Sequence, residues 1–202
     1  MQKRQAGFTL MELMVTLAVA GIVLGMAVPN FRSFMLNSRL TSAANDLIVA
    51  LHAARTEAIK RQLPVAMCAT DDAGEAVPEC SGGAYGQWVV WVDADNDWEP
   101  DNAANEPVLL RHMSIPDGVM VRVDSGETGI VKFRASGFAA DAAGGQVPTS
   151  NVVICDSRGT AAVSAGSSAA RAVLITATGR ARVTRDKAEI DTALDNIEEE
   201  CP

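Results

Sequence analysis

The sequence predicts an α+β protein in which one long N-terminal helix packs on a mainly antiparallel β-sheet. Three observations support this fold class. A long apolar run lies near the N-terminus, a stretch with helical periodicity follows it, and short β-branched and aromatic runs fill the rest of the 202-residue chain. With 48% hydrophobic and 21% charged residues, the chain can form one globular core and an additional element.

The first element is an apolar helix over residues 8–28, in which Glu12 is the only charged residue. At about 1.5 Å per residue this helix is ~30 Å long, which matches the hydrocarbon core of a bilayer. Lys3 and Arg4 precede it, so the N-terminus should remain cytoplasmic and the chain beyond Pro29 should be exported. A carboxylate at Glu12 is costly inside a membrane, and it therefore needs a cation.

Residues 29–62 continue the helix with an amphipathic pattern that ends before Pro64. This apolar face should pack on a head domain formed by residues 63–202. His52 lies on the same stretch and should be a surface or structural residue, because no second metal ligand is placed beside it. The apolar positions, spaced by three or four residues, are Leu36, Leu40, Ala44, Leu47, Leu51, Ala54 and Ala58.

From Val65 onward the chain consists of short strand-forming runs bounded by Gly, Pro, Asp and Asn. Their spacing leaves no room for βαβ crossovers, so the strands should pair antiparallel. The Ala-, Gly- and Ser-rich connections 139–145 and 161–170 are expected to be mobile surface loops. The expected strands are 65–69, 87–93, 108–112, 119–123, 129–133, 151–155, 172–176 and 180–184.

The four cysteines, Cys68, Cys80, Cys155 and Cys201, include no CxxC pair and no histidine at zinc spacing. In an exported chain an even number of cysteines predicts two disulfides. Of the three pairings we favour Cys68 with Cys80, which closes a polar loop, and Cys155 with Cys201, which ties down the C-terminus. Free buried thiols are the alternative.

The segment from Gly7 to Glu12 (GFTLME) resembles the class III leader of type IV prepilins, and Pro29 stands where that family commonly has its helix-bending proline. The resemblance implies that a prepilin peptidase removes residues 1–7 by cutting between Gly7 and Phe8, and that Phe8 is then methylated. It also implies that Glu12 meets the new α-amine of a neighbouring subunit, a buried pair that sets register. A generic anchor with an accidental acid is the alternative.

Five segments of the head occur in a characteristic order: WVVWVD at 88–93, VLLR at 108–111, IVKF at 130–133 before Gly137, VVICD at 152–156 and TGRAR at 178–182. They resemble the GspH/FimT family of minor pilins and pseudopilins. The resemblance implies the type IV pilin fold, an inner-membrane anchor with a periplasmic head, and assembly with other major and minor pilins or pseudopilins. The expected function is a structural and priming subunit of a type IV pilus, with a type II secretion pseudopilin of the H type as the alternative.

A DNA-binding function is a further alternative, carried by Gly179-Arg180-Ala181-Arg182. Alternate residues of a strand face the same side, so Arg180 and Arg182 could meet one phosphate backbone, with Arg185 and Lys187 close behind. In the FimT branch a Gly-Arg-x-Arg motif is associated with DNA uptake. The acidic tail 188–200 would oppose this binding if it folded beside the arginines, and a pair of solvated arginines is the simpler interpretation.

Composition and motifs exclude several other classes of function. A net charge of −8 and 4% aromatic residues argue against a protein that coats nucleic acid. The acidic loop 93–99 has the oxygen spacing of a calcium site, but Trp98 replaces its glycine and Ala104 its closing acid, so we expect a solvated turn and no metal. Without G-x-S-x-G, H-E-x-x-H, P-loop or Cys/His motifs, we expect no catalytic residues, no cofactor and no enzyme.

Overall fold

The computed structural model describes residues 7–81, 86–101, 105–124, 129–140, 149–164, 166–195, 197 and 201. The chain divides into two compact units, Met1–Ser38 and Arg39–Pro202. The leader residues 1–6 and the tail acids Glu198, Glu199 and Glu200 lie outside the described residues.

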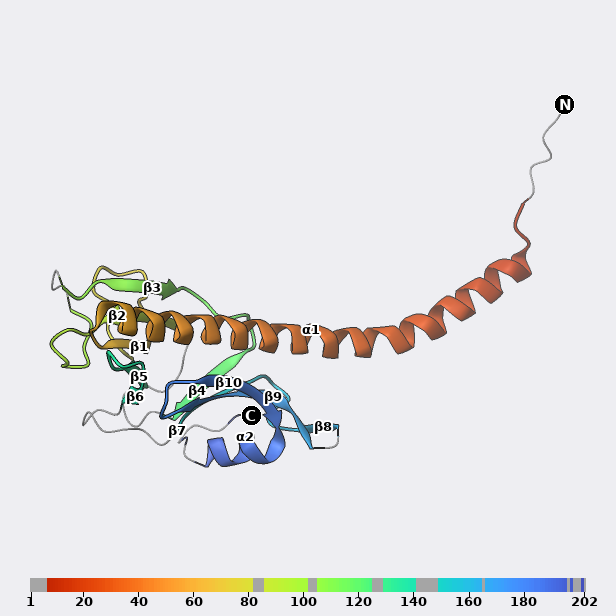
Figure 1. Ribbon diagram of the computed structural model, residues 1–202. Helices are drawn as coiled ribbons and strands as arrows, with labels where there is room; N and C mark the ends of the chain where they lie inside the picture. Colours follow the sequence, from red (N-terminus) through yellow and green to blue (C-terminus); the bar gives the residue numbers. More distant parts are fainter. Residues whose placement is uncertain are drawn as a thin grey trace. The chain divides into compact units, whose positions relative to one another are not determined.

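Helix α1 (Leu10–Arg61) accounts for the apolar run and the amphipathic stretch (Figure 1), so both predicted helical segments are confirmed. It begins two residues later than expected because Thr9 caps it: the Thr9 Oγ1 accepts a hydrogen bond from the backbone N–H of Glu12 at 3.2 Å. The helix ends at Arg61, where Gln62 takes a left-handed conformation with φ of 57° before Pro64.

The strands form two antiparallel sheets, whereas the sequence suggested a single sheet. The first has the order β3-β2-β1-β5-β6, and the second has the order β10-β9-β7-β4 with β8 paired to β9. Strand β4 follows β3 in the chain but pairs with β7. The bounds are β1 Val65–Thr70, β2 Gln87–Val92, β3 Val108–His112, β4 Met120–Asp124, β5 Ile130–Phe133, β6 Ala139–Ala140, β7 Thr149–Cys155, β8 Ala162–Ser164, β9 Ser167–Thr176 and β10 Ala181–Asp186.

The main core lies between the Arg39–Arg61 stretch of α1 and both sheets. Leu40, Leu47 and Leu51 of α1 are buried in one cluster with Trp88 of the first sheet and Val173 of the second. The predicted amphipathic face is therefore the face that packs on the head, as expected from its three- and four-residue spacing.

A second helix, α2 (Lys187–Leu194), was not anticipated from the sequence. It packs on the other face of the second sheet, where Ile190 and Ala193 are buried with Val153 and Ala172 (Figure 1). The second sheet is therefore covered by α1 on one face and by α2 on the other, and the residues along each of its strands alternate between these two faces.

The prediction that residues 161–170 form a mobile surface loop is wrong. Residues 162–164 form β8 and residues 167–170 are the first part of β9, in which Ala169 and Ala170 are fully buried. Small residues can fill a closely packed strand as well as a loop, so composition alone misassigned them. Ala139 and Ala140 likewise form the buried strand β6, while 141–145 lie outside the described residues.

Both favoured disulfides are present. Cys68 is bonded to Cys80 with a Cα–Cα distance of 5.7 Å, and Cys155 is bonded to Cys201 with a Cα–Cα distance of 6.1 Å. The second bond fastens the segment after α2 to β7, and it thereby holds the C-terminal end on the sheet face that α2 covers. Cross-links of this kind stabilise a fold mainly by restricting the unfolded chain.

Candidate functional site

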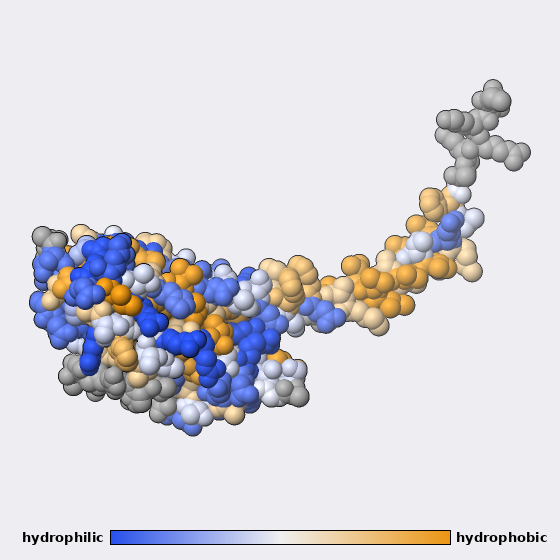
Figure 2. Space-filling view, viewed as in Figure 1, coloured by the Kyte–Doolittle hydropathy of each residue, from blue (hydrophilic) through white to orange (hydrophobic). Residues whose placement is uncertain are grey.

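The apolar part of α1 presents hydrophobic side chains on all its sides. Its residues are exposed throughout, for example Leu17 at 64% and Ile22 at 62% (Figure 2). By length and composition α1 contains one segment able to cross a membrane. An apolar surface of this extent is unfavourable in water, and it therefore requires lipid or other subunits around it.

Glu12 interrupts this apolar surface in the first turn of α1. Its backbone N–H is the donor to Thr9, and an acid in the first turn also interacts favourably with the helix dipole. Gly7 and the 83%-exposed Phe8 precede the helix, so the predicted cleavage point lies in non-helical backbone and the Thr9 cap would remain after cleavage. Pro29 lies within α1.

The candidate DNA-binding residues do not act as one group. Arg182 on β10 donates to Glu189 on α2, with Nη2–Oε1 at 2.6 Å and Nη1–Oε2 at 3.1 Å. This pairing raises the pKa of Arg182 and, together with a Thr184 hydrogen bond, lowers the pKa of Glu189 to about 2. Glu189, one of the acidic residues expected to oppose DNA binding, thus folds beside Arg182.

The other three candidate DNA-binding cations also differ in whether they have an acidic partner. Lys187 pairs with Asp191, both Nζ–Oδ distances being 2.8 Å. The exposed guanidinium groups of Arg180 and Arg185 have no hydrogen-bond or ion-pair partner among the described residues. Of four cations expected on one surface, two are therefore neutralised locally by α2.

Gly179, the first residue of the Gly-Arg-x-Arg motif, has a structural function. It adopts φ of +75°, and a Cβ built there would lie 2.1 Å from the carbonyl oxygen of Gly137. The same carbonyl accepts a hydrogen bond from the Nε of Arg55 on α1 at 3.0 Å. The turn between β9 and β10, the Gly137 turn and α1 therefore meet at a point where only glycine fits.

The acidic loop after β2 forms turns stabilised by its own side chains. The carboxylates of Asp95 and Asp97 accept hydrogen bonds from the backbone N–H groups two residues further on. The buried Glu106 accepts from the backbone N–H groups of Ala94 and Asp95 at 2.6 and 3.0 Å. Burial raises the pKa of Glu106, although these hydrogen bonds act in the opposite direction.

A lysine lies beside this loop. The fully buried Lys132 of β5 forms an ion pair with Asp93, and its Nζ lies 4.0 Å from the ring centroid of Trp98. Burial lowers the pKa of Lys132 despite the neighbouring carboxylates. One carboxylate oxygen from each of Asp93, Asp95 and Glu106 lies within 4.8 Å of the others. An ammonium group already provides positive charge at this cluster, and Ala104, the residue at the closing position of the calcium template, lies outside the described residues.

Neither histidine contributes to this cluster. His52 is exposed on α1, and His112 stacks on Trp88 with ring centroids 3.7 Å apart. His112 therefore contributes to packing of the first sheet.

Comparisons with known proteins agree with these features. The model of the family described as type II transport protein GspH matches residues 43–179, and the prokaryotic N-terminal methylation motif matches residues 2–28. The type IV minor pilin FimU of Pseudomonas aeruginosa is similar in structure, with a TM-score of 0.51 and 18% identity over 84% of this chain and 99% of that chain. This likeness shows the type IV pilin fold.

A second solved structure gives a weaker match. The minor pseudopilin EpsH of the type 2 secretion system of Vibrio cholerae has a TM-score of 0.42 and 12% identity, over 73% of this chain and 97% of that chain. No curated protein sequence matches the chain.

Proposed function

Since the chain belongs to the GspH family, we propose that it is a minor pilin that primes and enters a type IV pilus. The chain is a structural pilin-like subunit and not an enzyme. The observation that carries the priming proposal is the exposed apolar segment of α1, in which Glu12 is the single charge. Such a segment can remain in a membrane or pack against other apolar helices, which are the two environments of a filament subunit.

The proposed route begins in the inner membrane, with the head on the periplasmic side. A prepilin peptidase removes residues 1–7, and Phe8 then carries a methylated α-amine close to Glu12. In the filament, the Glu12 carboxylate of one subunit pairs with the α-amine of its neighbour. A buried ion pair contributes register more reliably than stability, because both groups lose their hydration. Mismatched subunit positions would leave a carboxylate unpaired in an apolar environment, at a cost of several kcal/mol.

Replacement of Glu12 by Ala should prevent entry into the filament while leaving the membrane-inserted pool intact. We expect at least a tenfold lower amount in sheared pili than in wild type, which corresponds to about 1.4 kcal/mol in subunit positioning. The measurement is immunodetection of the chain in sheared pili and in membranes of the same cells. Thr16→Ala is the matched control, because Thr16 is exposed on the same segment and bonds only to the carbonyl of Leu13. Normal incorporation of Glu12→Ala would disprove the assembly role.

The family model also favours a type II secretion pseudopilin of the H type as a second candidate. The same segment of α1 would then enter a short pseudopilus with other pseudopilins. Deletion of the gene distinguishes the two: loss of surface pili with normal protein secretion supports the pilin, and the reverse supports the pseudopilin.

DNA binding through Arg180 and Arg182 is a third candidate, and the structure suggests a sharper test of it. Glu189 competes with phosphate for Arg182, so Glu189→Gln should strengthen DNA binding several-fold, whereas Arg180→Ala with Arg182→Ala should weaken it strongly. The measurement is an electrophoretic mobility shift at several salt concentrations, where losing two phosphate contacts should reduce the salt slope by about 2. Binding that is unchanged in both variants would rule out this site.

A further inference from the structure

A pocket of about 680 Å³ lies beside the first sheet, between the loops that follow β1 and β2. Its lining includes the buried Ile130 of β5, which belongs to the apolar cluster on the face of the sheet opposite α1. The two walls are residues 77–81 and 97–100. Ligand pockets in proteins have volumes of about 300–1,000 Å³, so this pocket is large enough to hold part of another molecule.

The first wall is held in place by several independent contacts. Cys80 is bonded to Cys68 of β1, and the carboxylate of Asp72 accepts a hydrogen bond from the backbone N–H of Glu79 at 3.1 Å. Arg111 of β3 donates to three backbone carbonyl groups of the same loop, those of residues 73, 75 and 76. The wall therefore does not have to become ordered when a ligand binds, and this reduces the cost of binding.

The second wall is held by Trp98 and by the turn around it. The ammonium group of Lys132 lies 4.0 Å from the centroid of the Trp98 ring, and the carboxylate of Asp97 accepts a hydrogen bond from the backbone N–H of Glu99 at 2.9 Å. Lys132 is fully buried, forms an ion pair with Asp93 and does not line the pocket. Since Asp93 balances the charge of Lys132, this pair adds no net positive charge beside the pocket.

The lining combines an apolar surface with an acidic rim. Three exposed acids, Glu79, Asp97 and Glu99, line the pocket, and no lysine, arginine or histidine is among the described residues that line it. None of the three acids forms an ion pair with a described residue. The apolar lining residues are Val77, Pro78, Cys80, Trp98, Pro100 and Ile130. This combination suits a ligand that has both an aliphatic part and a positive charge.

We propose that this pocket binds an arginine side chain of a partner protein. The aliphatic part of arginine packs on apolar residues, while its planar guanidinium stacks on an aromatic ring and bonds to carboxylates through two N–H groups at once. The pocket offers the ring of Trp98 and the carboxylates of the acidic rim for these contacts. The net charge of −8 also favours a cationic partner, because it attracts positive charge from a distance.

The positions of the acidic residues favour a guanidinium over a metal ion. Among the described residues, only Asp93, Asp95 and Glu106 form a group of three whose carboxylate oxygens lie within 4.8 Å of one another. None of these three lines the pocket. The acids of the rim are therefore too widely spaced to hold one compact ion together, and they suit a cation whose charge is spread over a planar group. This inference rests on the head alone and does not depend on the filament function proposed above.

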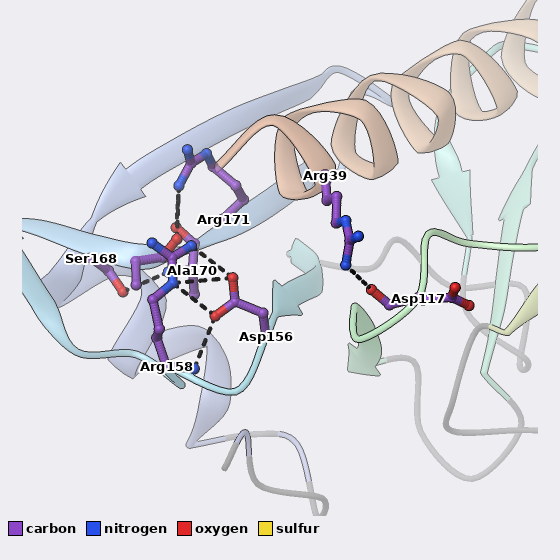
Figure 3. Close-up of polar contacts among 8 residues, drawn as sticks. Arg39, Asp117, Asp156, Arg158, Ser168, Ala170 and Arg171 are labelled. Atoms are coloured by element: carbon purple, nitrogen blue, oxygen red, sulfur yellow. Dashed lines mark hydrogen bonds and ion pairs between the residues drawn. The ribbon is translucent and has the colours of Figure 1, made fainter. Parts of the chain in front are cut away.

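No described arginine of this chain lines the pocket, so the occupant must come from another molecule. In the turn after β7, Arg158 bonds to both carboxylate oxygens of Asp156, with Nη2–Oδ2 at 2.7 Å and Nε–Oδ1 at 3.0 Å (Figure 3). The Nη1 of the buried Arg171 donates to the backbone carbonyl groups of Ala169 and Ala170 at 2.9 and 3.1 Å. The contact of Arg158 is the two-point guanidinium–carboxylate pair that we expect between the acidic rim and the arginine of a partner.

NMR titration of the full chain, with its disulfides intact and in a non-ionic detergent, tests the proposal. The probe is acetyl-Gly-Arg-Gly-amide at constant ionic strength, and the readout is the indole N–H signals of the three tryptophans. The signal of Trp98, assigned with Trp98→Phe, should shift saturably, with a dissociation constant on the order of 1 mM for so small a ligand. The signal of Trp88, which is buried on the α1 face, should not shift. The same peptide with citrulline in place of arginine should bind about tenfold more weakly, because citrulline has the shape of arginine without its charge.

Glu79→Gln with Glu99→Gln should weaken binding of the arginine peptide about tenfold, because two acids of the rim lose their charge. Asp71→Asn with Glu75→Gln is the matched control. Asp71 and Glu75 are exposed on the loop after β1 and do not line the pocket, and the control variant has the same net charge as the rim variant. It should bind the peptide like the wild type. An unmoved Trp98 signal, equal binding of the citrulline peptide, or equal losses in the two double variants would overturn the proposal.

Discussion

Gly179→Ala should destabilise the head by about 3 kcal/mol or more, one of the two largest effects expected for a single substitution in this chain. A left-handed conformation costs a residue with a Cβ about 1–2 kcal/mol. The new Cβ would also lie 2.1 Å from the carbonyl oxygen of Gly137, which is backbone and cannot rotate away. Overpacking of this kind costs about 1–3 kcal/mol more, and displacement of Gly137 would strain its bond to Arg55. Urea unfolding with the disulfides intact provides the measurement.

Gly118→Ala separates the two causes. Gly118 has nearly the same conformation, with φ of +77°, but a Cβ there meets nothing within 4 Å. It should therefore cost only the backbone contribution of about 1–2 kcal/mol. Equal losses in the two variants would show that the contact with Gly137 is not limiting. Because Gly179 opens the Gly-Arg-x-Arg motif, its variants should not be used to test DNA binding.

The sequence predicted the elements whose pattern is local. The apolar run, the amphipathic stretch and eight strands are encoded in spacings of a few residues, and the structure contains all of them. Strand partners are not encoded in this way. β4 and β5 follow one another in the chain but belong to different sheets, because pairing is decided by which apolar faces can cover α1. Local sequence patterns therefore could not distinguish the two sheets from the single sheet that was expected.

The environment of the candidate site residues also depends on contacts between distant segments, which no local sequence pattern encodes. Arg180 and Arg182 were identified from strand alternation, but the partner of Arg182 depends on the position of α2. The sequence did contain a signal for α2, because Asp186 followed three residues later by Glu189 is a typical helix N-cap pattern. In the structure the Asp186 carboxylate accepts a hydrogen bond from the backbone N–H of Glu189. The segment expected to be only an acidic tail, residues 188–200, therefore begins within a helix. Arg171 gave no sequence signal, because its burial results from packing of β9 between β7 and β10.

Lys132→Met is the second substitution expected to have a large effect, about 3–5 kcal/mol of unfolding free energy. Methionine preserves the length and apolar packing of the side chain, but it leaves the fully buried Asp93 without its cation. Removing one partner of a buried ion pair is far more costly than removing both, because the remaining charge keeps its desolvation penalty. The substitution also removes the cation from the ring of Trp98 and should loosen the acidic loop.

The double variant Asp93→Asn with Lys132→Met should recover most of the stability lost in Lys132→Met. With both charges removed, the pair costs neither desolvation nor an unpaired charge, and only polar contacts of the loop are lost. Urea unfolding of the wild type, both single variants and the double variant gives the coupling energy between Asp93 and Lys132. A double variant as unstable as the sum of the single variants would mean that Lys132 acts through packing on Trp98, and that its charge does not hold Asp93 in place.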